Sequence, residues 1–283
     1  MIKTKSIIGA LLVSILLAAA PAVAQEGGHS TPEIKKEAWS FAGPFGTYDR
    51  NQLQRGFQVF KEVCASCHSA RLLAFRNLGE PGGPEFTEGQ VKALAAEYQI
   101  TDPDAEGGKR PGIAADRWPS PFANDREAMA ANGGALPPDF SVIAKARGTT
   151  QPFPWWILNY FTAYSEGGPD YIHALLNGYE AAPPAGTTDF PAGKYYNHVF
   201  PGHAISMAPP LADGVVTYET GETGSVPLTR DQYSRDVAAF LMWVAEPHLV
   251  ARKEAGFQVM AFLLLFAGLM YLVKRRLWSR VEH

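Results

Sequence analysis

Apolar residues gather in two long runs, one near each end of the chain, and the stretch between them mixes short apolar segments with polar and turn-forming residues. The first run, at 7–20, follows Lys3 and Lys5 and precedes Ala22-Val23-Ala24. A positive start, a short apolar core and a small-residue cleavage site are typical of a secretory signal peptide. We expect residues 1–24 to be removed and the remainder to be exported to a bacterial periplasm.

The second apolar run, at 254–273, carries no charge from Ala255 to Val273. Its length is close to the roughly 20 residues that cross a bilayer, and a buried core helix is seldom apolar on all sides. Four basic residues follow within 274–283, whereas only Arg252 and Lys253 stand directly before it. This imbalance predicts one transmembrane helix at 253–273 in the inner membrane, a cytoplasmic tail at 274–283 and a periplasmic domain at 25–252.

Apolar positions between the two runs recur at helical spacing in several short segments. Leu53, Phe57 and Phe60 share one stripe, and Thr229 begins the last segment as part of a predicted capping box with Gln232. Proline- and glycine-rich stretches separate the segments, and almost no strand-like alternation is present. We predict a mostly helical domain with long irregular insertions, which suits a fold built around a large prosthetic group. The predicted helices are 50–64, 88–98, 124–132, 155–164, 170–177 and 230–245.

Charge is unevenly distributed along the chain. The whole sequence has a formal net charge of −3, but residues 25–252 contain 18 basic and 26 acidic residues, a net charge of −8. The segment 80–106 has seven acidic residues and Lys92 as its single basic residue. It is either a solvated face or a docking surface for a basic partner. The negative sign disfavours nucleic acid as a partner.

The chain has two cysteines, Cys64 and Cys67, and His68 follows the second directly. This spacing is found in thiol redox sites, in halves of zinc sites and in c-type haem attachment sites. A zinc site would need a second ligand cluster, which the remaining histidines do not form. A thioredoxin-like site would need a neighbouring βαβ pattern, which is missing here. The motif therefore favours covalent attachment of one haem c.

A helix that continued from residue 50 into the motif would place Cys64 and Cys67 one turn apart on one side. Both sulfurs could then form thioethers with the haem vinyl groups, and His68 could bind the iron as an axial ligand.

The other axial ligand must come from elsewhere, and the context of each methionine separates the candidates. Met207 lies in "FPGHAISMAPPL", an irregular segment stiffened by prolines, whereas the remaining methionines fall in helical or apolar segments or at the N-terminus. A stiff loop presents a thioether at little entropic cost. His203 in the same loop is the rival ligand. We favour Met207, because Met/His ligation is common in c-type cytochromes.

The sequence resembles the cytochrome c1 family over nearly the whole exported part. The resemblance rests on "RGFQVFKEVCASCHSARLLAFRNLG", "ANGGALPPDFSVIAKARG", "YYNHVFPGHAISMAPPL" and "DVAAFLMWVAEP", together with the basic end of the C-terminal apolar run. It implies a cytochrome c-like haem domain. It also implies haem attachment through Cys64 and Cys67, with His68 and Met207 as the iron ligands. A role for His203 is not implied, since the family often has another residue at this position.

The resemblance further implies an electron-transfer subunit of ubiquinol–cytochrome c reductase, in a respiratory or photosynthetic chain. Such a subunit accepts electrons from the Rieske iron–sulfur protein, reduces a cytochrome c and assembles with cytochrome b. Quinol oxidation would not be carried by this chain, and no side chain would be catalytic.

Two other functions remain open from the residues. One is a different membrane-anchored periplasmic cytochrome with a single haem that delivers electrons to a terminal oxidase. The other is a thiol–disulfide oxidoreductase that uses Cys64 and Cys67.

Overall fold

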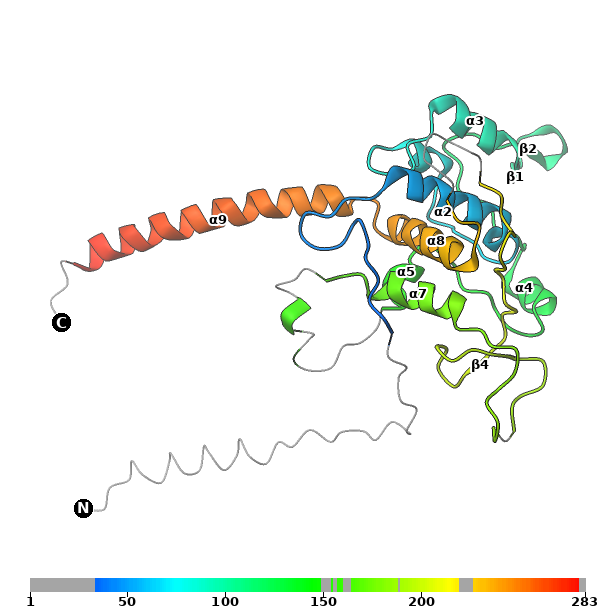
Figure 1. Cartoon of the computed structure of the whole chain (residues 1–283). Helices are drawn as coiled ribbons and strands as arrows, with labels where there is room; N and C mark the ends of the chain where they lie inside the picture. Colours follow the sequence, from blue (N-terminus) through cyan, green and yellow to red (C-terminus); the bar gives the residue numbers. More distant parts are fainter. Residues whose placement is uncertain are drawn as a thin grey trace, which may run out of the picture. The chain divides into compact units, whose positions relative to one another are not determined.

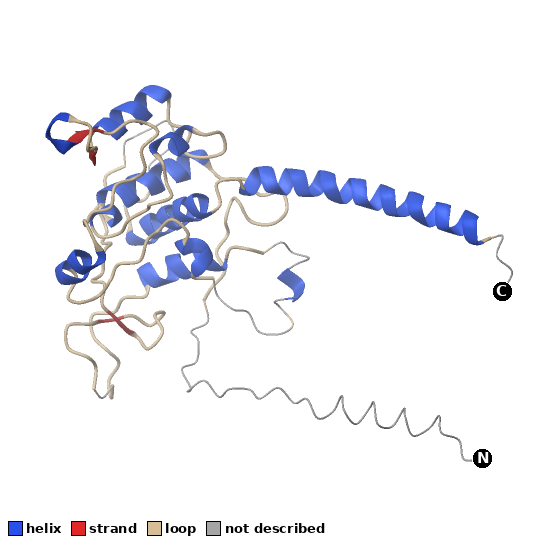
Figure 2. Ribbon diagram, turned by 180° about the vertical axis from the view of Figure 1, so that it is seen from behind, coloured by secondary structure: helices blue, strands red, loops and turns tan. Residues whose placement is uncertain are grey.

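The structure is a computed structural model that describes residues 34–148, 154, 157–159, 164–187, 189–218 and 226–279. The expected signal peptide and most of the helix expected at 155–164 lie outside these residues. The described part is mostly helical with short strands and one long apolar helix at its C-terminal end (Figures 1 and 2), which confirms the predicted fold class.

Helices account for most of the regular structure. The α-helices are α2 (Arg50–Glu62), α3 (Glu88–Ala96), α4 (Asp125–Ala131), α5 (Ile143–Ala146), α7 (Gly167–Asn177), α8 (Arg230–Ala245) and α9 (Leu249–Trp278). The 3₁₀ helices are η1 (Cys64–Ser66), η2 (Phe75–Gly79) and η3 (Glu106–Gly108). Two antiparallel hairpins complete the set, β1 (Gln99–Thr101) with β2 (Lys109–Pro111) and β3 (Tyr195–Tyr196) with β4 (Ala204–Ile205).

Two details of the sequence prediction were wrong. Helix α2 ends at Glu62, because the chain tightens into the 3₁₀ turn η1 before the two cysteines. At the start of α8, Thr229 accepts a hydrogen bond from the Gln232 N–H, but the Gln232 carboxamide donates to Asp236 instead of returning to Thr229. The expected membrane segment 253–273 lies within α9, which extends beyond it at both ends because the flanking residues are also helical.

The core forms where α2 crosses α8. Phe57 and Phe60 on α2 pack against Phe240 on α8, with ring centroids 5.7 and 5.5 Å apart. Gly56 permits this approach, because a Cβ added there would lie 2.1 Å from the Asp236 carbonyl oxygen. The predicted apolar stripe is therefore the surface that joins the two longest helices of the domain.

A buried carboxylate fixes the same crossing. Asp236 is fully buried and accepts hydrogen bonds from Arg55 Nε at 2.9 Å and Arg55 Nη2 at 3.1 Å. Tyr218 Oη and Gln232 Nε2 donate to it as well, each at 2.9 Å. A buried charge is tolerated when it is paired and hydrogen-bonded in this way.

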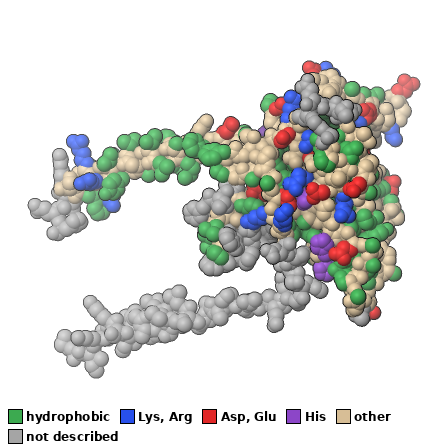
Figure 3. All heavy atoms as spheres, viewed as in Figure 1, with side chains coloured by type: hydrophobic (Ala, Val, Ile, Leu, Met, Phe, Trp, Pro, Cys, Tyr) green, Lys and Arg blue, Asp and Glu red, His purple; other side chains and the backbone are tan. Residues whose placement is uncertain are grey.

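Helix α9 is 30 residues long, and its most apolar window is not buried against any described part of the chain. Figure 3 shows hydrophobic side chains along this helix, followed by a basic group at its far end. By length and composition the helix could cross a membrane.

Candidate functional site

The two cysteines and His68 lie on a tight turn that directly follows α2. The backbone N–H groups of Cys67 and His68 both donate to the Cys64 carbonyl, at 3.1 and 3.0 Å. The motif therefore forms one turn, as expected, although it is a 3₁₀ turn and not a continuation of α2. Both cysteines are partly buried free thiols.

His68 is buried and held by the segment 138–141. Its Nδ1 lies 2.8 Å from the Pro138 carbonyl oxygen, and its ring stacks on Phe140 with centroids 4.0 Å apart. A carbonyl can only accept, so Nδ1 carries the proton and Nε2 presents a lone pair. A hydrogen bond at one ring nitrogen is the usual way in which a metal-binding histidine is oriented.

Asp139 ties the 138–141 segment to the residues after the motif. Its carboxylate accepts from Ser69 Oγ at 2.7 Å, from the Arg71 N–H at 3.0 Å and from the Ser141 N–H at 2.8 Å. Burial raises the pKa of this carboxyl, but the hydrogen bonds from Ser141, Arg71 and Ser69 outweigh that effect and keep the pKa below its ordinary value. The charge is thus stable at neutral pH.

Burial also sets the protonation of the motif itself. It lowers the pKa of His68, against the opposing effects of the Pro138 carbonyl and the Asp139 charge, so the imidazole is neutral. Burial, reinforced by the neighbouring Cys67, raises the pKa of Cys64 to about 12. A neutral imidazole is the form that binds metals.

Met207 lies in the loop after β4, where it is partly buried and packs against the same hydrophobic core as Cys64. Its carbonyl oxygen accepts a hydrogen bond from Tyr179 Oη at 3.1 Å. Tyr179 directly follows the C-cap of α7, so this bond connects the Met207 loop to the helical part of the domain.

Asn197 connects α7 to the turn between β3 and β4, which precedes the Met207 loop. It is fully buried, its Nδ2 donates to the Leu175 carbonyl at 2.8 Å, and its Oδ1 accepts from the Val199 and Phe200 N–H groups. The rival residue His203 has a φ of 60° and stacks on Tyr196, and its Nδ1 lies 3.3 Å from the Asn197 carbonyl oxygen.

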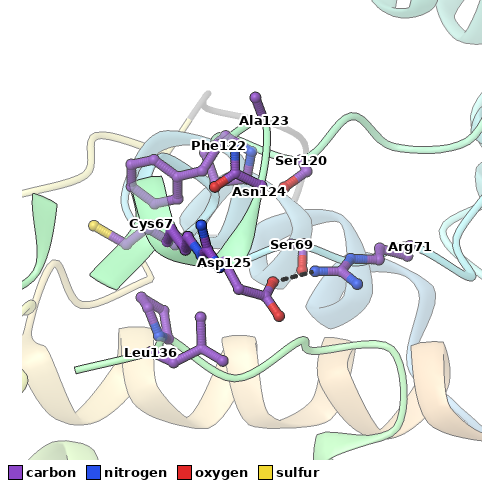
Figure 4. Close-up of a pocket in the computed structure, with 13 residues that line it drawn as sticks. Cys67, Ser69, Arg71, Ser120, Phe122, Ala123, Asn124, Asp125 and Leu136 are labelled. Atoms are coloured by element: carbon purple, nitrogen blue, oxygen red, sulfur yellow. Dashed lines mark hydrogen bonds and ion pairs between the residues drawn. The ribbon is translucent and has the colours of Figure 1, made fainter. Parts of the chain in front are cut away.

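A cavity of about 680 Å³ adjoins the motif. Its lining includes Cys67, Phe122 and Leu136, and the ion pair between Arg71 and Asp125 lies at its polar side (Figure 4). Of the expected haem-binding residues only Cys67 lines this cavity; Cys64, His68 and Met207 do not.

The donor set fits haem c. His68 is buried, and its Nδ1 is hydrogen-bonded to the Pro138 carbonyl oxygen. Its Nε2 has no hydrogen-bond partner among the described residues. Two free thiols stand within one turn of this nitrogen.

Sequence reasoning missed the residues that support the motif from a distance. Pro138, Phe140, Tyr179 and Asn197 were not singled out, although Pro138 and Phe140 lie in the quoted "ALPPDFS". The adjacent prolines and the following Asp were the available signal, since they are typical of a rigid turn.

Comparisons with known proteins agree with this geometry. A family model described as "Cytochrome C1 family" matches residues 39–281. A "Cytochrome b/c1" from Bradyrhizobium diazoefficiens is 54% identical over 90% of this chain, which spans only 36% of that protein. A "Cytochrome c1" from Blastochloris viridis is 49% identical over 94% of this chain and 93% of its own length. Another from Rhodospirillum rubrum is 43% identical over 95% of both chains. The resemblance drawn from the motifs is confirmed, and the chain belongs to the cytochrome c1 family.

Proposed function

We propose that the chain is the haem-carrying electron-transfer subunit of a ubiquinol–cytochrome c reductase. It would receive single electrons from a Rieske iron–sulfur protein and deliver them to a cytochrome c, with cytochrome b as its other neighbour in the assembly. The observation that carries the proposal is the orientation of His68, whose Nδ1 is held by the Pro138 carbonyl so that Nε2 is left to bind a metal.

The residues would divide the work of holding one covalent haem. Cys64 and Cys67 would form the thioethers, while His68 and Met207 would bind the iron. Haem c, when bound, supplies a one-electron iron couple whose potential depends on those ligands. With both iron ligands supplied by the protein, the group would serve electron transfer only, and this chain would not itself oxidise quinol.

The membrane arrangement follows from α9. We infer that it crosses the bacterial inner membrane once, with the haem domain in the periplasm and the basic end in the cytoplasm. The basic residues in the last turn of α9, Arg275 and Arg276, support this orientation.

A thiol–disulfide oxidoreductase fits less well. Reactive CxxC thiols have a lowered pKa, often at a helix N-terminus. Here burial raises the pKa of Cys64, and the motif follows the C-terminal end of α2. A cytochrome that serves a terminal oxidase directly would use the same haem site and would differ in its partners.

Purification of the full chain from its membrane distinguishes the three candidate functions. A pyridine haemochrome spectrum with the thioether signature, one haem per chain, and near-equal amounts of cytochrome b and Rieske protein are expected. Freely alkylated Cys64 and Cys67 would contradict haem attachment. Haem without those two partners would favour the oxidase-linked cytochrome.

A further inference from the structure

A short uncharged loop, residues 40–47, displays one aromatic side chain to the outside. Phe45 is 82% exposed, which makes it the most exposed large hydrophobic side chain among the described residues. The loop reads "SFAGPFGT" and contains no charged side chain. Exposing a phenylalanine to water is unfavourable, but a single exposed apolar side chain is common on protein surfaces, so what lies beside this one decides whether it has a partner.

The loop is built to hold that position. Its base is closed by the Thr47 N–H, which donates to the Ser40 carbonyl at 3.1 Å. Gly46 folds back on Ala42 so closely that an added Cβ would lie 2.1 Å from the Ala42 carbonyl oxygen. Phe41 is fully buried, with its ring stacked 5.4 Å from Trp39. The exposed ring therefore sits on a rigid support.

The same loop is fastened to the first turns of α9. Lys253 Nζ donates to the Phe41 carbonyl at 2.6 Å and to the Gly46 carbonyl at 3.3 Å. The rings of Phe45 and Phe257 meet edge to face, with centroids 6.5 Å apart. The loop consequently lies level with the beginning of the apolar part of α9.

The length of the uncharged part of α9 determines the depth of the loop 40–47 relative to the membrane. The uncharged stretch 255–273 has 19 residues, which at 1.5 Å per residue span about 28 Å. A bilayer core is about 30 Å thick, so the helix has no spare apolar turn that could remain outside it. Phe257 is the third residue of this stretch, about 3 Å from its start. Its partner Phe45 must then be at the boundary between headgroups and hydrocarbon.

We propose that the loop 40–47 inserts Phe45 into the inner membrane beside α9, at the membrane–water interface on the periplasmic side. This would be a second membrane contact of the domain. The proposal rests on the proposed membrane crossing of α9. Phe45 would contact the headgroup region of the phospholipids, where aromatic side chains are favoured. Two contacts, the helix and the loop, would restrict tilting of the domain about a single anchor.

Photo-crosslinking in native membranes tests this. Phe45→benzoylphenylalanine in the full chain should give phospholipid adducts, and its exposure means that the fold should tolerate the change. Ile113→benzoylphenylalanine is the matched control, because Ile113 is 53% exposed and comes two residues after β2. Strand β2 lies on the side of the domain away from α9 (Figure 1). Lipid adducts at position 45 should exceed those at position 113 at least tenfold.

The same substitution at Leu263, Leu264 and Leu265 in turn reports on α9 itself, since successive helical positions point in three directions. Lipid adducts in α9 with none at position 45, or an adduct of position 45 with another protein, would overturn the loop proposal alone. No lipid adduct at any of the three α9 positions would contradict the membrane crossing, and the loop proposal with it.

Discussion

At the scale of single residues, the imidazole of His68 is oriented by groups far away in the sequence. The Pro138 carbonyl that holds Nδ1 is 70 positions from it, and Phe140 supports the ring from one face. The motif "CASCH" could be found in the sequence because its residues are neighbours. The contacts of His68 with Pro138 and Phe140 could not be derived from the motif, because every residue has a backbone carbonyl and the sequence does not show which one lies near the imidazole.

Met207 gives the first prediction. A thioether ligand favours ferrous iron and raises the potential, so Met207→Leu should lower the midpoint by roughly 0.1 V or more, within the ~0.8 V that axial ligands span. Haem should remain attached through Cys64 and Cys67, carbon monoxide should bind, and most quinol-to-cytochrome c turnover should be lost. A redox titration and a carbon monoxide difference spectrum check this. An unchanged potential without carbon monoxide binding would make His203 the leading ligand.

Tyr179 should act on Met207 through the backbone, as a positioning residue. Tyr179→Phe removes the hydroxyl that donates to the Met207 carbonyl and keeps the ring. Loss of one such bond costs about 1 kcal/mol, enough for a roughly fivefold larger population with a displaced loop. We expect partial carbon monoxide binding and a lowered potential. Tyr195→Phe is the control, since Tyr195 is 43% exposed on β3. Equal carbon monoxide binding in the two variants would show that the hydroxyl does not position Met207.

At the scale of elements, helical periodicity predicted α8 with its observed bounds and α2, α3 and α4 to within two residues at either end. Element ends were less predictable. The end of α2 depends on the turn that follows it. The Gln232 carboxamide donates to Asp236, a buried carboxylate whose other partners come from distant parts of the chain, so the missing capping box could not be read from the local sequence. The hairpin β3–β4 has two residues per strand, too few for a visible alternation.

The crossing of α2 and α8 yields a stability prediction. In Gly56→Ala the new Cβ would meet the Asp236 carbonyl oxygen, a backbone atom that cannot rotate away. We expect a loss of about 2–3 kcal/mol in the free energy of unfolding of the haem-containing protein. Gly89→Ala in α3 is the matched control, because an added Cβ there meets nothing within 4 Å. It should be neutral or stabilising by up to ~1 kcal/mol. Equal denaturation midpoints for both variants would refute the close approach.

Glu246 joins three helices and should make stability depend on pH. Its carboxylate, just after α8, accepts from Lys145 of α5 at 2.8 Å and from Arg252 of α9 at 2.6 Å. Burial raises the pKa of Glu246, but Lys145 and Arg252 outweigh that effect and hold the pKa below its ordinary value. The stabilisation is therefore complete above the unfolded-state pKa of about 4.3 and is lost as pH falls through the lower folded-state pKa.

Glu246→Gln should accordingly lower the free energy of unfolding by about 0.5–1 kcal/mol at pH 7, since the two cations are partly exposed. The difference from wild type should shrink between about pH 5 and pH 3. Denaturant titrations at each pH measure it. If the difference in the free energy of unfolding between wild type and Glu246→Gln stays constant down to pH 3, the ion pairs of Glu246 contribute nothing to that difference.

At the scale of the whole molecule, the acidic segment 80–106 is less negative than its sequence indicates. Glu85, Glu97 and Asp102 pair with Arg50, Lys61 and Arg110, three basic residues that lie outside the segment. Glu88 pairs with Lys92 inside it. Sequence counting could not show this, because the compensating charges come from α2 and from β2. Of the seven acidic residues, Glu80, Asp104 and Glu106 have no basic side chain within ion-pair distance in the described part of the chain.

This distribution sharpens the question of whether the segment docks a basic cytochrome c. If it does, Asp104 and Glu106 should contribute most, because their charges are uncompensated and lie close together between β1 and β2, whereas the Glu80 carboxylate accepts a hydrogen bond from Asn77 Nδ2. Electron transfer to the acceptor should slow as salt rises, since the Debye length falls to about 3 Å at 1 M. Asp104→Asn with Glu106→Gln should reduce the slope of log rate against salt. Glu180→Gln with Asp189→Asn changes the net charge equally, near the β3–β4 hairpin, which lies at the other end of the domain from α3 in Figures 1 and 2. If only this second pair reduces the slope, the acceptor docks at the hairpin end. If neither pair does, segment 80–106 is a solvated face.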